Sequence, residues 1–210
     1  MKKDLQLLQI LNARILHDLA GAIGVVDNSL SLIGTSTKDI SRQAKSLAIE
    51  ESGNLVKKLN IFRLSYSSSD LGEETSVVYL IKLLKDFLSI SKKIQLNLDF
   101  EGGILYLDTA LAKVTLCLVM IASEKMHFNG KIAVFCGKDK DNIFVKIASE
   151  ATKNLVISDD SLKILTDGEN PQVDIQNCRE CYVNKLCKSS GYKIIATTKD
   201  KNLEYNVQKL

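Results

Sequence analysis

The sequence has 210 residues, 45% of them hydrophobic, which is enough for one large domain or two small ones with a buried core. The formal net charge is only +3 and charges of both signs are interspersed, which excludes the concentrated positive charge of a nucleic-acid-binding protein. The sequence shows no secretory signal, and no apolar run reaches the roughly 18 residues that cross a bilayer. We therefore expect a soluble, cytoplasmic protein, not bound to membrane, with protein or small-molecule partners.

The first predicted helix covers Lys3 to Ile33, and Gly34 is placed to end it. At about 100° per residue, its apolar side chains form one stripe, and His17 lies roughly 160° away from Ile15 and Leu19. His17 is therefore predicted to point away from the core. The stripe consists of Leu5, Leu8, Leu11, Ile15, Leu19, Val26, Leu30 and Ile33.

The same outward face continues with Gly21, Gly24 and Asn28, so a shallow groove with almost no side chains follows the histidine. A glycine inside a helix costs about 1 kcal/mol relative to alanine, which favours close approach by another molecule at this groove. The alternative interpretation is an ordinary solvated histidine on a helix whose glycines allow tight helix packing.

A second helix is predicted from Ser36 to Tyr66, where Ser36 and Asp39 resemble a capping box, and it forms an antiparallel hairpin with the first. Two helices alone do not enclose a core. Pairing with a second copy would give a four-helix bundle that buries both sides, and coverage by the C-terminal half is the alternative. The additional apolar surface is supplied by Leu16, Val25, Ile49 and Val56.

The polar segment Ser67–Ser76 reads as a linker between a hairpin domain, residues 1–69, and a second domain, residues 70–210. The second domain shows both helical and alternating patterns, which predicts an α+β chain with helices packed against a sheet. Helices are predicted at Ser76–Ser91, Thr109–Phe128 and Pro171–Ser190, and strands at Ile94–Phe100, Ile104–Leu107, Lys131–Phe135, Ile143–Ile147, Tyr192–Thr197 and Leu203–Val207.

The five cysteines are predicted to be reduced, because their number is odd and no secretory signal is present. Cys178, Cys181 and Cys187 lie close together in CRECYVNKLC, but this spacing lacks a fourth nearby metal ligand. We therefore expect these three cysteines to pack in the core, and no metal site.

The N-terminal helix resembles the first helix of the ChpT-like histidine phosphotransferases and, more distantly, the H-box of histidine kinases. The resemblance rests on Arg14, Leu16, His17, Asp18 and Leu19, on the small residues 20–24, and on Asn28, Leu30 and Leu32. The order of elements is similar along essentially the whole chain. The resemblance implies a hairpin that dimerises as a four-helix bundle, followed by an α/β sandwich that resembles a degenerate histidine-kinase ATPase domain.

The resemblance also implies that His17 is phosphorylated and passes the phosphoryl group between receiver-domain aspartates of a hybrid histidine kinase and of response regulators, in a bacterial multistep phosphorelay. It implies that Asp18 orients the imidazole or accepts its proton, and that Arg14 lies near the phosphoryl group. Ala22 stands where many family members have proline. The expected docking floor for the receiver is Ala20, Gly21, Gly24 and Asn28.

The chemistry of histidine agrees with this role. A neutral imidazole is nucleophilic near pH 7, and its phosphoramidate is reactive enough to pass the phosphoryl group to a carboxylate. The receiver would bring its own acidic pocket with Mg²⁺, so we expect the chain to have no cofactor of its own.

An active histidine kinase is the second candidate, and a non-catalytic dimeric scaffold is the third. A kinase needs an asparagine-bearing helix and glycine-rich loops that hold nucleotide phosphates. The corresponding helix, TLCLVMIASEKM, has no asparagine, and Thr115, Cys117 and Ser123 are poor metal ligands. Between Ile147 and Pro171, the chain offers only Asp167 and Gly168 for such a glycine-rich loop. These absences favour a relay over a kinase.

Overall fold

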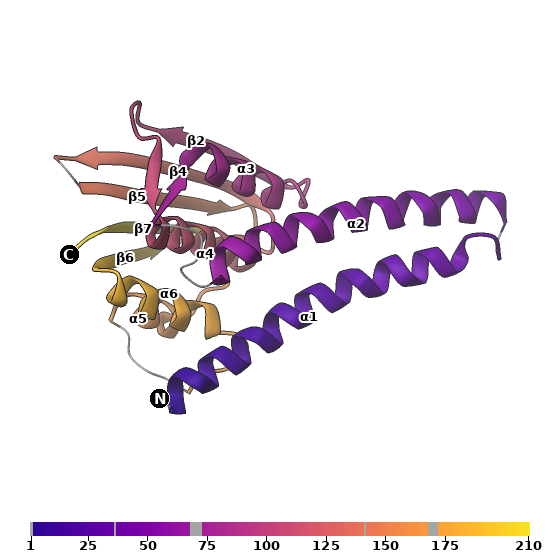
Figure 1. The fold of residues 1–210 in the computed structure, drawn as a ribbon, viewed down its shortest axis with the longest axis horizontal. Coiled ribbons are helices and arrows are strands. Elements are labelled where there is room, and N and C mark those ends of the chain that lie inside the picture. The colour runs from indigo at the N-terminus through magenta and orange to yellow at the C-terminus, as the bar shows by residue number, and fades with distance from the viewer. Residues whose placement is uncertain (1, 36, 68–72, 141, 168–171) are drawn as a thin grey trace.

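Two long antiparallel helices open the fold in the computed structural model, which describes residues 2–35, 37–67, 73–140, 142–167 and 172–210 (Figure 1). Helix α1 spans Lys2–Leu32 and helix α2 spans Lys38–Tyr66. Gly34 lies in the turn at φ +86°, a left-handed conformation that favours glycine. The predicted helical hairpin is confirmed. Ser36 lies outside the described residues, and Thr37 occupies the N-cap position of α2.

A five-stranded sheet forms the centre of the C-terminal unit, in the order β2-β4-β5-β7-β6. Strands β2 and β4 are parallel, and the other neighbours are antiparallel. The strands are β2 (Ile94–Phe100), β4 (Gly130–Asp139), β5 (Asn142–Ala151), β6 (Tyr192–Lys199) and β7 (Asn202–Lys209). Two short strands, β1 (Glu74–Ser76) and β3 (Tyr106–Asp108), form a separate antiparallel pair.

Helices cover only one face of the large sheet, the face toward the hairpin (Figure 1). They are α3 (Val77–Leu88), α4 (Thr109–Lys125), α5 (Asp159–Thr166) and α6 (Cys178–Ser189). The sequence of β4 explains why only one face is covered. Ile132 and Val134 are buried and alternate with exposed Lys131, so one side of the strand is apolar and needs helices over it. Helix α4 is buried along almost its whole length and forms the centre of the core. The predicted α+β chain with helices against a sheet is confirmed.

Several element boundaries differ from the prediction for local reasons. The last predicted helix begins only at Cys178, because the Asp174 carboxylate accepts the backbone N–H groups of Gln176 and Asn177, at 2.8 and 2.9 Å, and closes a turn there. Pro171, where that helix was expected to start, lies outside the described residues.

The helix expected to reach Phe128 ends at Lys125, because His127 and Phe128 take left-handed backbone angles, φ 50° and 54°. Strand β1 lies inside the expected linker, and α5 was not predicted from the sequence. The predicted domain boundary, between residues 69 and 70, falls among residues 68–72, which are outside the described residues.

The C-terminal unit packs against the N-terminal half of α1 and against α2 from about Glu50 to Tyr66, while the turn of the hairpin projects away (Figure 1). The rings of Tyr66 and Tyr182 meet with centroids 5.3 Å apart, and the Tyr182 hydroxyl donates to the Ser65 carbonyl at 2.9 Å. A small apolar cluster completes this contact. Its buried members are Leu7, Leu11, Ile164, Cys178 and Cys181.

The rest of the hairpin keeps a second apolar surface exposed. Leu16 is 66% exposed and Ile49 is 65% exposed, and Val25 and Val56 are exposed as well. The predicted stripe on α1 is only partly covered, since Leu11 is buried but four of its other members are exposed: Leu5, Leu8, Leu30 and Ile33. The C-terminal unit therefore covers one face of the hairpin and leaves another uncovered. Among the described helices, none is both long and apolar enough to cross a membrane.

Candidate functional site

His17 lies near the middle of α1, and its side chain is 81% exposed. The prediction that it points away from the core is confirmed. Its Nδ1 atom lies 3.5 Å from Oδ1 of the neighbouring Asp18. One ring nitrogen therefore faces a carboxylate, and the imidazole is otherwise accessible from solvent.

Small residues surround the histidine on the same face of α1. By helical geometry Ala20, Gly21, Gly24 and Asn28 all lie within about 60° of His17 around the helix axis. A Cβ atom added at Gly21 or Gly24 would meet no atom within 4 Å. The structure therefore leaves open space beside the histidine, and the docking of a receiver on these residues stays a prediction.

Asp18 connects the histidine to the C-terminal unit. Its Oδ2 atom accepts a hydrogen bond from Nη2 of Arg179 at 2.8 Å, while its Oδ1 atom faces His17. Arg179 belongs to α6 and is 161 residues away in the sequence. The carboxylate next to the histidine is thus held by a helix of the other unit.

Arg14, one helical turn before His17, is directed toward the C-terminal unit. Its Nη2 atom forms an ion pair with Glu124 of α4 at 2.8 Å, and its Nη1 atom donates to the Ile175 carbonyl at 2.5 Å. Its Nε atom lies 3.9 Å from Asp18 Oδ2. With Arg14 placed in this way, its predicted proximity to a phosphoryl group on His17 remains untested.

We call Arg14, Asp18, Glu124 and Arg179 the charge cluster. Arg179 is its centre, with a side chain only 3% exposed, and it contacts Glu124 as well as Asp18 and donates through Nε to the Tyr66 hydroxyl at 3.0 Å. Two guanidinium groups and two carboxylates balance in charge, as buried charges require. The cluster joins α1, α2, α4 and α6 at one point beside His17.

Sequence reasoning missed Glu124 and Arg179, because both are remote from His17 along the chain. One signal was available: each is a charged residue in a helix that is otherwise largely buried. A charge in such a place needs a partner of opposite sign. The sequence does not say which partner it finds.

The kinase-related positions of α4 lie inside the core. The hydroxyl groups of Thr115 and Ser123 donate to carbonyls of their own helix at 2.8 and 2.7 Å. Cys117 is fully buried, and burial raises the pKa of its thiol to about 12. None of these three side chains faces a space that a nucleotide or metal ion could enter. Asp167 is exposed after α5, and Gly168 lies outside the described residues.

The cysteines of α6 are buried, as predicted. Burial raises the pKa of the Cys178 and Cys181 thiols to about 11 and that of Cys187 to about 12. Within the described ranges, no three side chains of the His, Cys, Asp or Glu type come together as a metal site would need.

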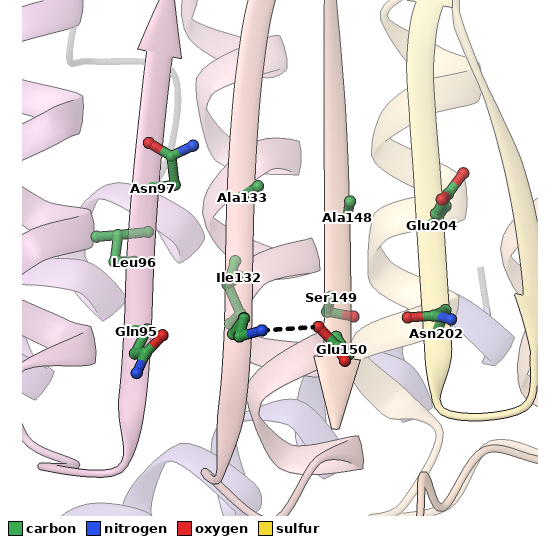
Figure 2. Close-up of a pocket in the computed structure, with 11 residues that line it drawn as sticks. Gln95, Leu96, Asn97, Ile132, Ala133, Ala148, Ser149, Glu150, Asn202 and Glu204 are labelled. Atoms are coloured by element: carbon green, nitrogen blue, oxygen red, sulfur yellow. Dashed lines mark hydrogen bonds and ion pairs between the residues drawn. The ribbon is translucent and has the colours of Figure 1, made fainter. Parts of the chain in front are cut away.

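The open face of the sheet carries a groove of about 470 Å³ (Figure 2). It is lined by residues of β2, β4, β5 and β7, among them Lys131 and Glu150, which form an exposed ion pair at 3.2 Å between neighbouring strands. Ser149 lies at its edge, but the hydroxyl donates to the Leu203 carbonyl at 3.0 Å. Because the groove is on the face opposite the helices, it is separate from His17 and the charge cluster.

No protein-family model matches the sequence, and no curated protein sequence matches it. Solved structures do match. A bacterial phosphotransferase superposes with a TM-score of 0.82 at 18% identity, over 97% of this chain and 96% of that one. The Acinetobacter baumannii histidine kinase AdeS gives 0.50 at 15% identity, over 92% of this chain and 96% of its own. The histidine kinase ThkA, in complex with the response regulator protein TrrA, gives 0.50 at 15% identity, over 99% of this chain and 63% of its own. The chain therefore has the fold of this bacterial phosphotransferase and, less closely, of histidine kinases, as the resemblance predicted.

Proposed function

We propose that this protein is a histidine phosphotransferase that carries a phosphoryl group on His17 between receiver-domain aspartates of a hybrid histidine kinase and of response regulators. The observation that carries the proposal is the setting of His17. Its side chain is 81% exposed, the space at Gly21 and Gly24 beside it is open, and a carboxylate lies next to one of its ring nitrogens. A relay needs such a nucleophile with room for a partner around it.

The chemical demands of the relay are few. Phosphoryl transfer needs mainly in-line positioning and neutralisation of charge on the phosphoryl oxygens. The receiver would supply the aspartate and the Mg²⁺ ion, so the phosphotransferase contributes the imidazole and a docking surface. His17 and the small residues that follow it supply both.

Two observations favour this proposal over an active kinase. The α4 positions that would serve a nucleotide are filled with buried side chains that bond within their own helix. The solved phosphotransferase also superposes far better than the kinases do, with a TM-score of 0.82 against 0.50. That a kinase of related fold, ThkA, forms a complex with the response regulator TrrA supports a receiver as the partner.

We further propose that the hairpin pairs with that of a second copy to form a four-helix bundle. The exposed apolar side chains of α1 and α2, among them Leu16 and Ile49, would be covered in such a dimer. Association driven by this apolar area would leave the His17 face, which consists of small and polar residues, free for the receiver.

The relay is tested by mixing the protein with a receiver that carries phosphorus-32 on its aspartate. We expect acid-labile label on the wild type and none on His17→Gln. The chain offers a matched control in its second histidine, because His127 is exposed after α4, so His127→Asn should accept label normally. A wild type that takes up no label from any cognate receiver or kinase would contradict the proposal and leave the scaffold as the remaining candidate.

The kinase alternative has its own test. Incubation with labelled ATP in the absence of any partner should leave the protein unlabelled. Label on His17 under these conditions would show that the C-terminal unit binds and uses nucleotide.

A further inference from the structure

Arg179 is the residue of α6 that contacts Asp18, the neighbour of His17. Its guanidinium is buried, lies over the ring of Phe62 with its central carbon 5.8 Å from the ring centroid, and donates to the Tyr66 hydroxyl at 3.0 Å. These contacts fix the plane of the guanidinium. Its Nη2 atom then holds Asp18 Oδ2 at 2.8 Å, which leaves Oδ1 of the same carboxylate 3.5 Å from His17 Nδ1.

We propose that Arg179 is a positioning residue for phosphotransfer: it holds Asp18 so that the carboxylate faces Nδ1 of His17 and keeps the proton on that nitrogen, which leaves Nε2 as the nucleophile. This inference rests on the proposed function and assigns the C-terminal unit a part in it. A neutral imidazole carries its proton on either nitrogen, and the hydrogen bond made at one nitrogen decides which. At 3.5 Å the two atoms are close but not yet hydrogen-bonded, and catalytic contacts of this kind often tighten only when the partner binds.

The transfer step needs no additional base, because no proton leaves the imidazole. The lone pair of Nε2 forms the N–P bond, and the P–O bond to the receiver's aspartate breaks, with its electron pair going to that carboxylate. The proton stays on Nδ1, so the phosphorylated ring carries a positive charge. The Asp18 carboxylate, fixed by Arg179, lies next to that charge and stabilises it.

If its role were purely structural, Arg179 would only hold α1 and α6 together and would not affect His17. A second ion pair, between Lys185 and Asp4 at 2.7 Å, also joins these two helices. Asp4 lies more than three helical turns from His17. Lys185→Met is therefore the matched control: it removes an α1–α6 ion pair and leaves the surroundings of His17 unchanged.

The first measurement is the protonation of His17 in the unphosphorylated protein, by nitrogen-15 NMR of the imidazole rings. We expect the wild type and Lys185→Met to carry the proton on Nδ1. In Arg179→Met and in Asp18→Asn the proton should shift toward Nε2, while the signals of His127 serve as an internal reference and stay unchanged. An Nδ1 proton that persists in Arg179→Met would overturn the proposal.

The second measurement is the rate constant for phosphoryl transfer from a phosphorylated receiver, at a temperature at which each variant is folded by circular dichroism. Arg179→Met should slow transfer by about tenfold to a hundredfold, the scale on which a small misplacement of a reacting group acts, and Lys185→Met should not change it. Arg179→Lys should fail to restore the rate, since an ammonium lacks the planar fork that bonds several partners at once.

The double variant separates positioning from other effects. If Arg179 acts through Asp18, adding Arg179→Met to Asp18→Asn should not slow transfer further. Multiplicative effects, or equal losses in Arg179→Met and Lys185→Met, would assign Arg179 a structural role. Failure of the proposed function is distinguishable, because it leaves the wild type without label, whereas the NMR measurement needs no phosphorylation.

Discussion

At the scale of single residues, the charge cluster shows what burial demands of a charged side chain. Arg179 can be buried because its guanidinium reaches Asp18, Glu124 and Tyr66 at the same time. Glu124 in turn is shared between Arg179 and Arg14. Each member satisfies two others, so removal of one leaves charges in the protein without compensation.

Glu124→Gln should lower the free energy of unfolding by about 2 kcal/mol, because it leaves two guanidinium groups facing a neutral amide. Urea denaturation checks this value. The matched control is Glu150→Gln, which breaks an exposed ion pair with Lys131 and should change stability by less than about 0.5 kcal/mol. Equal effects of the two substitutions would contradict the buried character of the cluster.

Stability should fall as the pH rises from about 9 to 12. Burial raises the thiol pKa from 9.0 to about 11 in Cys136, Cys178 and Cys181, and to about 12 in Cys117 and Cys187. Above pH 9 the unfolded chain loses these protons and the folded chain keeps them, so unfolding becomes easier by roughly 1 kcal/mol per thiol between pH 9 and 10.

This loss is measured by urea denaturation at a series of pH values. In Cys136→Ala the free energy of unfolding should decline less steeply with pH, because the contribution of one thiol is missing. Stability that rises with pH in this window would contradict the prediction.

At the scale of elements, α1 has different neighbours on different sides. Arg14 and Asp18 lie against the C-terminal unit, Leu16 is exposed on the far side, and His17 lies between them. The histidine is thus held on an element fixed by packing on one side, while its own face stays open. A rigid helix positions a reactive group better than a loop does.

Gly21→Leu should raise the free energy of unfolding by about 0.5–1 kcal/mol, since glycine is a poor helix former and the added side chain meets no atom. The same substitution should slow phosphotransfer from a receiver at least about tenfold, because bulk beside His17 prevents the in-line approach. Urea denaturation and the transfer assay measure the two effects.

Asn97→Leu is the control for this substitution, as it adds the same side chain to the exposed sheet face shown in Figure 2. It should leave the rate unchanged. An unimpaired rate in Gly21→Leu would remove this face from the docking surface.

At the scale of the whole molecule, the hairpin and the C-terminal unit share one contact region, and the rest of the hairpin projects with apolar side chains exposed (Figure 1). Apolar surface of this kind is typical of protein interfaces. The C-terminal unit leaves these side chains uncovered, as the proposed four-helix bundle requires.

Ile49→Arg should convert the proposed dimer to a monomer, because it places a charge in the apolar face of the hairpin. Light scattering at several concentrations gives the mass. Val78→Arg is the matched control: Val78, on α3, is the more exposed of the two, at 76%, and does not belong to the apolar side chains of α1 and α2, so this variant should leave association unchanged. A wild type that is monomeric throughout, yet transfers phosphate, would refute the bundle.

The sequence by itself determined the helical hairpin, the strands of the large sheet and the exposure of the histidine. Hairpin and strands follow from residue periodicity, a local property, and His17 could be placed on the outer face of α1 by counting positions around the helix. The predicted ends of helices were wrong where a side chain forms hydrogen bonds with the backbone, as Asp174 does before α6. Such hydrogen bonds leave no periodic signal.

Only the tertiary structure decided what surrounds the histidine. Arg179 is 161 residues from Asp18 in the chain, and no local pattern links them. The two meet because α6 packs between the sheet and α1, which depends on the summed packing of the whole core. Tertiary packing brings distant side chains together, so His17, the proposed nucleophile, could be found from the sequence, whereas the arginine that holds Asp18 could not.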